Sequence, residues 1–80
     1  MIYSLMENGI IDDIKSLKKE FDCTMDSSTK HRVITINTNY SFLLKSDIDT
    51  VLYVTQKYNY ELYFIAIIDN KIVIKLISGD

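Results

Sequence analysis

The chain contains one cysteine and one histidine, Cys23 and His31, which are its candidates for a thiol nucleophile and its base. Such a dyad requires a partly exposed thiol beside the imidazole. Cys23, however, alternates with Asp22 and Thr24 on the apolar side of a short strand pattern. A buried, unreactive thiol is expected there, so we predict no catalytic dyad.

Metal and phosphate sites lack their usual residues as well. A structural zinc site takes four Cys or His ligands, and two glycines are too few for a phosphate-binding loop. The pairs Asp12/Asp13 and Asp47/Asp49 could bind a hard cation, but the helix dipole already explains acids in a first helical turn. We therefore expect no cofactor and no enzymatic activity.

Tyrosine is the chemically informative residue, because five of the six tyrosines lie between residues 40 and 63. A tyrosine offers a large contact area with few rotatable bonds and is enriched in protein interfaces. Tyr58 and Tyr60 flank Asn59 just before the strongest strand pattern, and we predict both as exposed anchors. The predicted partner-binding set is Tyr53, Tyr58, Tyr60 and Phe64, with Asp47, Asp49, Lys71 and Lys75 at the rim.

The strongest strand pattern covers residues 60–77, YELYFIAIIDNKIVIKLI. Two apolar runs are separated by Asp69 and Asn70, which tolerate the positive φ of a two-residue hairpin turn. Both faces of the first run are apolar, which predicts a strand in the centre of a sheet with something covering each face. The chain itself could supply both covers, or one face could be a partner site formed by Leu62, Phe64, Ala66 and Val73.

The N-terminal segment predicts a helix from Leu5 to about Glu20. Ser4 and Glu7 have the spacing of a capping box at its start. Apolar residues then recur at steps of three and four, as on one side of a helix. They are Met6, Ile10, Ile14, Leu17 and Phe21.

From Phe21 the period changes to two, which predicts three strands at residues 21–25, 33–38 and 40–44. Their connections are too short for a parallel crossover, so the three strands should form an antiparallel meander.

Residues 46–57 fit both a helix and a strand. Ser46 and Asp49 have capping-box spacing, and Ile48, Val51 and Leu52 form a helical stripe, whereas the β-branched residues lower helix propensity. We favour a short helix.

Together these elements predict an α+β fold, α-β-β-β-α-β-β, with an antiparallel sheet of about five strands and the N-terminal helix on one face. Eighty residues, 48% of them hydrophobic, predict a single ordered domain covering residues 1–80. The lone cysteine favours a reducing compartment, and the sequence shows no signal peptide or membrane span, so we expect a soluble, cytoplasmic protein.

The segment NGIIDDIK, followed by the alternating pattern through HRVITINTNYSFLLKS, resembles the helix-then-meander opening of one small anti-CRISPR family that inhibits Cas9. The resemblance covers about half of the chain. It implies a stoichiometric inhibitor, encoded by a phage or another mobile element, that docks on a larger host protein or ribonucleoprotein such as a CRISPR effector. That family blocks DNA loading through a strongly acidic surface, whereas this chain has a formal net charge of −2.

Three hypotheses therefore follow. The first is a non-enzymatic inhibitor that occludes a larger host protein. The second is a small nucleic-acid-binding or regulatory protein that stacks bases on the same tyrosines, for which Lys57, Lys71 and Lys75 supply only a weak positive groove. The third is a structural homodimer closed through the second face of the sheet.

Overall fold

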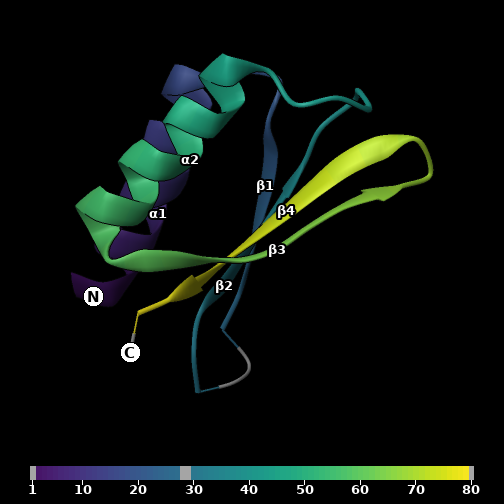
Figure 1. Cartoon of the computed structure of the whole chain (residues 1–80). Helices are drawn as coiled ribbons and strands as arrows, with labels where there is room; N and C mark the ends of the chain where they lie inside the picture. Colours follow the sequence, from purple (N-terminus) through teal and green to yellow (C-terminus); the bar gives the residue numbers. More distant parts are fainter. Residues whose placement is uncertain (1, 28–29, 80) are drawn as a thin grey trace.

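The computed structural model describes residues 2–27 and 30–79, with side-chain positions from residue 9 onward. Two helices lie side by side against one face of a four-stranded antiparallel sheet (Figure 1). The elements are α1 (Ile2–Leu17), β1 (Asp22–Asp26), β2 (Val33–Asn37), α2 (Lys45–Tyr58), β3 (Tyr60–Ile68) and β4 (Lys71–Ser78). The α+β class and the antiparallel sheet are thus confirmed, with four strands instead of five.

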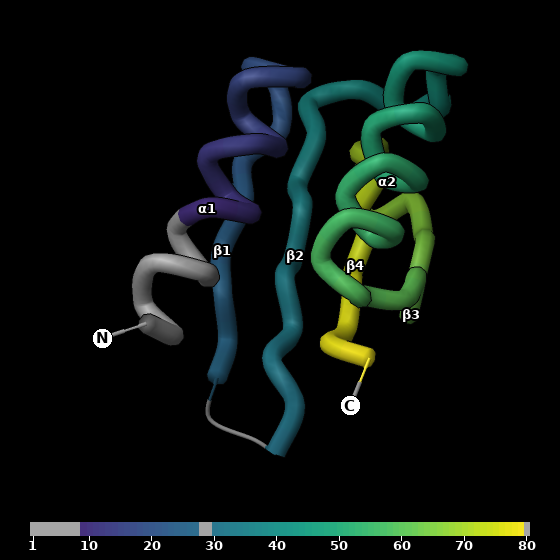
Figure 2. Tube along the Cα trace, turned by 90° about the vertical axis from the view of Figure 1, so that its left-hand side faces the viewer, coloured from purple at the N-terminus to yellow at the C-terminus, as the bar shows by residue number. Residues whose placement is uncertain are grey.

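The strands lie in the order β1-β2-β4-β3, which Figure 2 shows from the side of the helices. Strands β2 and β3 both run antiparallel to β4, which lies between them. Together with α2 they form a split β-α-β unit. The prediction that residues 60–68 form a central strand is therefore wrong, because β3 is an edge strand and β4 takes the central place.

The hydrophobic core lies between the helices and the sheet. Helix α1 contributes Ile10 and Ile14, and α2 contributes Val51 and Val54. Alternate residues of the strands complete the core from the sheet: Cys23, Ile34, Ile36, Ile72, Ile74 and Leu76. The helical stripe of α1 is confirmed where the side chains are described, whereas Met6 and the Ser4/Glu7 capping box lie outside that part.

The predicted strand at residues 40–44 does not form. Thr38 N–H donates to the Ile72 carbonyl at 3.1 Å and Ile72 N–H donates to the Tyr40 carbonyl at 2.9 Å, but the pairing stops there. Tyr40 turns toward the core, Phe42 lies in solvent and Leu44 becomes the N-cap of α2. The apolar residues of this segment alternate as in a strand, but the segment instead leads from the sheet into α2.

Helix α2 confirms the favoured interpretation of residues 46–57, although its start differs. The carboxylate of Asp47 accepts the Leu44 N–H at 3.0 Å and caps the first turn, in place of the predicted Ser46/Asp49 pair. The helix ends at Asn59, which takes the left-handed conformation with φ of 58°.

The hairpin turn forms as predicted. Asp69 and Asn70 both have positive φ, 54° and 65°, as a type I′ turn requires. The pairing is Ile68 with Lys71, Ile67 with Ile72 and Ile65 with Ile74. A register shift between Leu62 and Phe64 then moves Leu62 opposite Leu76, onto the helix side of the sheet.

Candidate docking surface

The second face of the sheet has no helix of the described chain over it, because α1 and α2 both pack on the first face (Figures 1 and 2). Strand alternation places on this open face the residues that alternate with the core positions. Its apolar members come mainly from β3 and β4, and all of them keep some exposure. They are Val33, Phe64, Ala66, Ile68, Val73 and Ile77, and we call this set the open-face patch.

The open-face patch has polar borders. Lys75 lies within the face, with its ammonium 5.4 Å from the centroid of the Phe64 ring. Thr24 and Thr35 continue the same row across β1 and β2, where the face becomes polar. Phe64 and Ile68 remain 39% and 47% exposed. The face thus combines an apolar half that contains Lys75, a second lysine (Lys71) at the end beside the hairpin turn, and a polar half.

Strand β3 is exposed on both sides. On the helix side, Ile67 is 62% exposed, and at the register shift Tyr63 is 60% exposed. A small apolar groove of about 70 Å³ runs between α2 and β3. Its walls include Ile48 and Leu52 of α2, both exposed, with Leu62 and Ile65 of β3. Isolated exposed apolar residues are ordinary, whereas large contiguous apolar patches are typical of interaction surfaces.

The predicted tyrosine anchors occupy different environments. Tyr58 and Tyr60 are partly buried and pack against the core, so the prediction that they stand exposed is wrong. Tyr58 connects the helices, since its hydroxyl donates to Asp13 Oδ2 at 2.6 Å. Tyr53 lies exposed on α2, next to the ammonium of Lys57. Sequence reasoning could not separate these roles, because exposure depends on the position of α1 beside α2.

A second interaction ties the same two helices together. Lys57 Nζ lies 2.8 Å from Asp13 Oδ2 and 3.3 Å from the Tyr53 hydroxyl. Hydrogen bonds from Lys57 and then from Tyr58 lower the pKa of Asp13. The bond to Asp13 raises the pKa of Tyr58. Asp13, Lys57 and Tyr58 thus form a surface cluster that links α1 to α2, and this structural role accounts for their pKa shifts.

Asp47 was predicted at the rim of a binding surface, and that prediction is wrong because its side chain is fully buried. Lys18 Nζ lies 2.8 Å from Asp47 Oδ1, and the Tyr40 hydroxyl donates to the same oxygen at 2.8 Å. Burial alone would raise the pKa of Asp47, but hydrogen bonds from Lys18, Leu44 N–H and Tyr40 outweigh it and lower the pKa. The carboxylate joins α1, the 38–44 connection and α2.

The remaining predicted rim residues lie at the surface or near it. Asp49 is exposed on α2 and pairs with Lys45 one turn away, with 3.1 Å between Oδ2 and Nζ. Lys71 is exposed beside the hairpin turn, and Lys75 is half-buried over Phe64. Of the predicted set, Phe64, Lys71 and Lys75 therefore share the open face.

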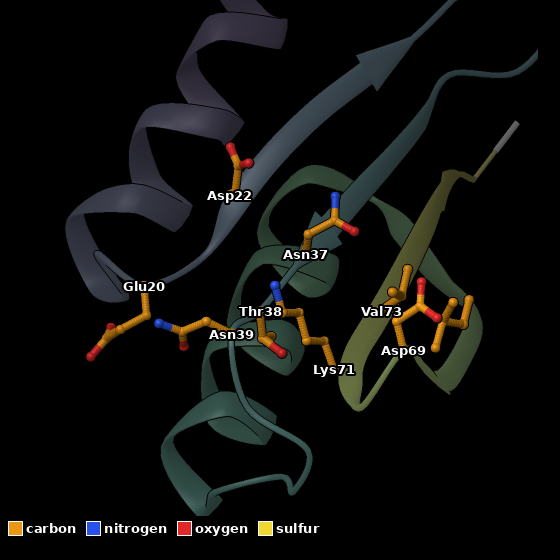
Figure 3. Close-up of a pocket in the computed structure, with 9 residues that line it drawn as sticks. Glu20, Asp22, Asn37, Thr38, Asn39, Asp69, Lys71 and Val73 are labelled. Carbon is orange, nitrogen blue, oxygen red and sulfur yellow. The ribbon is translucent and has the colours of Figure 1, made fainter.

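A polar hollow of about 420 Å³ adjoins this face near the hairpin turn (Figure 3). It is lined by Glu20 in the connection after α1, by the start of β1, by the end of β2 with the two residues that follow, and by the hairpin turn with the adjoining ends of β3 and β4. Its carboxylates do not converge, because Glu20 and Asp69 lie on opposite sides of the hollow in the close-up. Among the described residues, no group of three or more His, Cys, Asp or Glu could hold a metal ion.

Cys23 is buried on the helix side of β1, and burial raises the pKa of its thiol to about 11. An activated thiol would require the opposite shift. Cys23 lies near the start of β1, whereas His31 precedes the segment of β2 that pairs with the end of β1. The β1–β2 pairing therefore places Cys23 and His31 toward opposite ends of β1, which does not favour a Cys23–His31 dyad.

Comparison of the chain with protein-family models, with curated proteins and with solved structures found no match. Among the described residues, no helix is both long and apolar enough to cross a lipid bilayer.

Proposed function

We propose that this protein is a non-enzymatic interaction protein that docks on a larger protein through the open-face patch and blocks that protein by occlusion. One observation supports this proposal above the others: both helices lie on one face of the sheet, so no helix within residues 2–27 and 30–79 covers the apolar half of the other face. Antiparallel sheets commonly leave one face in water, but that face is then usually polar. Here its β3 and β4 half carries five apolar side chains, with Glu61, Lys71 and Lys75 as its charged residues.

The chemistry of the patch indicates what kind of protein would fit. Large apolar side chains supply the buried centre of an interface, and Lys71 and Lys75 would face acidic groups at the rim of the partner. The ring of Phe64, with Lys75 over it, is the best-placed aromatic anchor. The resemblance of the sequence to an anti-CRISPR family suggests an inhibitor of phage or mobile-element origin, whose partner would be a CRISPR effector in the host cytoplasm.

The nucleic-acid alternative receives less support. Base stacking needs exposed aromatic rings along a positive groove. Tyr40, Tyr58 and Tyr60 pack against the core, and the open face carries acidic residues on β1 as well as its two lysines. No second function is therefore proposed.

Affinity capture from a native host lysate, followed by a titration of the captured partner at two salt concentrations, tests the proposal. We expect a stoichiometric protein partner whose affinity changes little between about 50 and 200 mM salt, because apolar contacts dominate. Loss of several orders of magnitude over that range would instead indicate phosphate contacts and would refute the proposal.

A further inference from the structure

Strand β3 is an edge strand without the usual protection against pairing with another chain. Natural edges carry lysines, prolines, β-bulges, inward-pointing charges or short strands that discourage pairing. The nine-residue β3 has no charged residue between Leu62 and Ile68, and the whole chain has no proline. Its one irregularity, at Tyr63, leaves residues 64–68 regularly paired with β4.

The backbone of β3 presents hydrogen-bonding groups along this edge. In a two-residue type I′ hairpin, the residues that flank the turn, Ile68 and Lys71, form a hydrogen-bonded pair. Because hydrogen-bonded and non-hydrogen-bonded pairs alternate, Ile65 and Ile67 direct their N–H and C=O groups away from β4. Another strand could accept and donate these hydrogen bonds.

We propose that β3 pairs antiparallel with β3 of a second copy of this chain, about a twofold axis at Ala66. A twofold axis there brings Ile65 opposite Ile67 of the other copy, and Phe64 opposite Ile68. Ala66 would meet itself in a non-hydrogen-bonded pair, where Cα atoms approach to about 4.5 Å and a small side chain fits. No like charges meet along residues 62–68, so the strand is complementary to itself.

The exposed apolar side chains of β3 set an upper limit to the area that such a dimer could bury. Six large side chains of β3 are between 39% and 62% exposed. With roughly 150–200 Å² for a fully exposed large side chain, β3 offers about 500 Å² per copy. Leu43, Ile48 and Leu52 border the groove on the same edge and would add about 250 Å². The sum, about 750 Å² per copy, is an upper limit, because Phe64 and Ile68 keep their open-face sides in solvent when the edges pair. A standard interface buries roughly 800 Å² per partner, so the edge supplies enough apolar surface only for a small interface.

Such a dimer would have one continuous eight-stranded sheet, with the two open-face patches on the same side. The dimer can be tested separately from the proposed function. Val73 belongs to the open-face patch but lies on β4, which is inside the sheet and away from the β3 edge. Val73→Lys should therefore leave the dimer intact even where it abolishes partner binding.

Sedimentation of the full chain between about 1 and 300 μM tests the dimer, with the variant Ile67→Lys and the control Leu17→Lys. Leu17 is similarly apolar and exposed, but it ends α1 and lies on the β1 side of the sheet. We expect the wild type and Leu17→Lys to approach twice the 9.3 kDa chain mass, and Ile67→Lys to remain at 9.3 kDa. Its dissociation constant should rise at least about 100-fold, because each dimer would bury two ammonium groups.

Hydrogen exchange of the wild type gives a readout that does not depend on whether the variant folds. The Ile65 and Ile67 amides should become protected as concentration rises, while other amides of the sheet change little. A wild type that is monomeric throughout, or concentration-independent exchange at these two amides, would overturn the proposal. Protection of these amides only after addition of a different protein would also overturn it, since the edge would then have another occupant.

Discussion

Replacement of Asp47 by alanine should be the most destabilising single change in the connection between the helices. Its buried carboxylate accepts from Lys18 Nζ and the Tyr40 hydroxyl, each at 2.8 Å, and from Leu44 N–H at 3.0 Å. The Lys18 side chain is only 11% exposed. Asp47→Ala would therefore leave an ammonium group and a hydroxyl without their shared acceptor in a largely dry site.

The expected magnitude follows from these partners. Removal of one member of a buried ion pair costs about 3–5 kcal/mol, because the other charge stays buried without compensation. A domain of this size has a total stability of about 5–15 kcal/mol, so a substantial part of the fold's stability is at stake. Asp47→Asn keeps one oxygen acceptor and loses the charge, and it should cost less, about 1.5–3 kcal/mol.

The same site predicts a pH dependence. The pKa of Asp47 in the folded protein is lower than the unfolded value of 3.8, so its contribution to stability is fully present above pH 3.8. It should be lost as the pH falls through the folded pKa, where the carboxylate becomes protonated. Asp47→Asn should therefore show a smaller loss of stability between pH 5 and the acid limit than the wild type.

Urea denaturation followed by circular dichroism, at pH 7 and at several acidic values, measures these differences. Lys45→Ala is the control, because it removes an exposed pair with Asp49 and should change the free energy of unfolding by less than about 1 kcal/mol. If Asp47→Ala were within 1 kcal/mol of the wild type at pH 7, the buried network would not hold the helices together as argued.

Two further predictions concern Tyr58, whose predicted exposure is wrong, and Cys23, whose predicted burial is confirmed. Tyr58→Phe should lower the unfolding temperature less than Tyr58→Ala, since phenylalanine keeps the packed ring and loses only the hydrogen bond to Asp13. Equal decreases of the two unfolding temperatures in calorimetry would show that packing of the ring contributes nothing. The Cys23 thiol, with its pKa raised to about 11, should react with an aromatic disulfide reagent at pH 8 far more slowly in the folded protein than in urea, and equal rates would show that the thiol is accessible.

The elements that follow from periodicity were predictable from the sequence. The stripe containing Ile10 and Ile14 predicted α1, alternation predicted β1 and β2, and Asp69–Asn70 predicted the hairpin turn. These signals are local, because they depend on how consecutive side chains point from a helix or a strand.

The errors arose where local patterns compete with packing. Residues 40–44 alternate like a strand, but the chain must leave the sheet there, since Asp47 caps a helix that begins at Lys45. Strand β3 is apolar on both faces like a central strand, yet it lies at the edge, and nothing in its composition reveals the position of β4. The predicted exposure of Tyr58 is wrong because its hydrogen bond to Asp13 joins residues 45 positions apart, and a contact of that range leaves no local pattern in the sequence.

Affinity for the captured partner, compared among three forms of the protein, tests most directly the claim that the open-face patch docks on another protein. Val73→Lys places a charge in the middle of the patch, and Leu17→Lys places the same charge on an exposed apolar position elsewhere. Circular dichroism checks that both variants fold. Calorimetry should show that Val73→Lys weakens binding by about 10- to 100-fold or more, whereas Leu17→Lys binds like the wild type. Unchanged affinity in folded Val73→Lys would contradict the account.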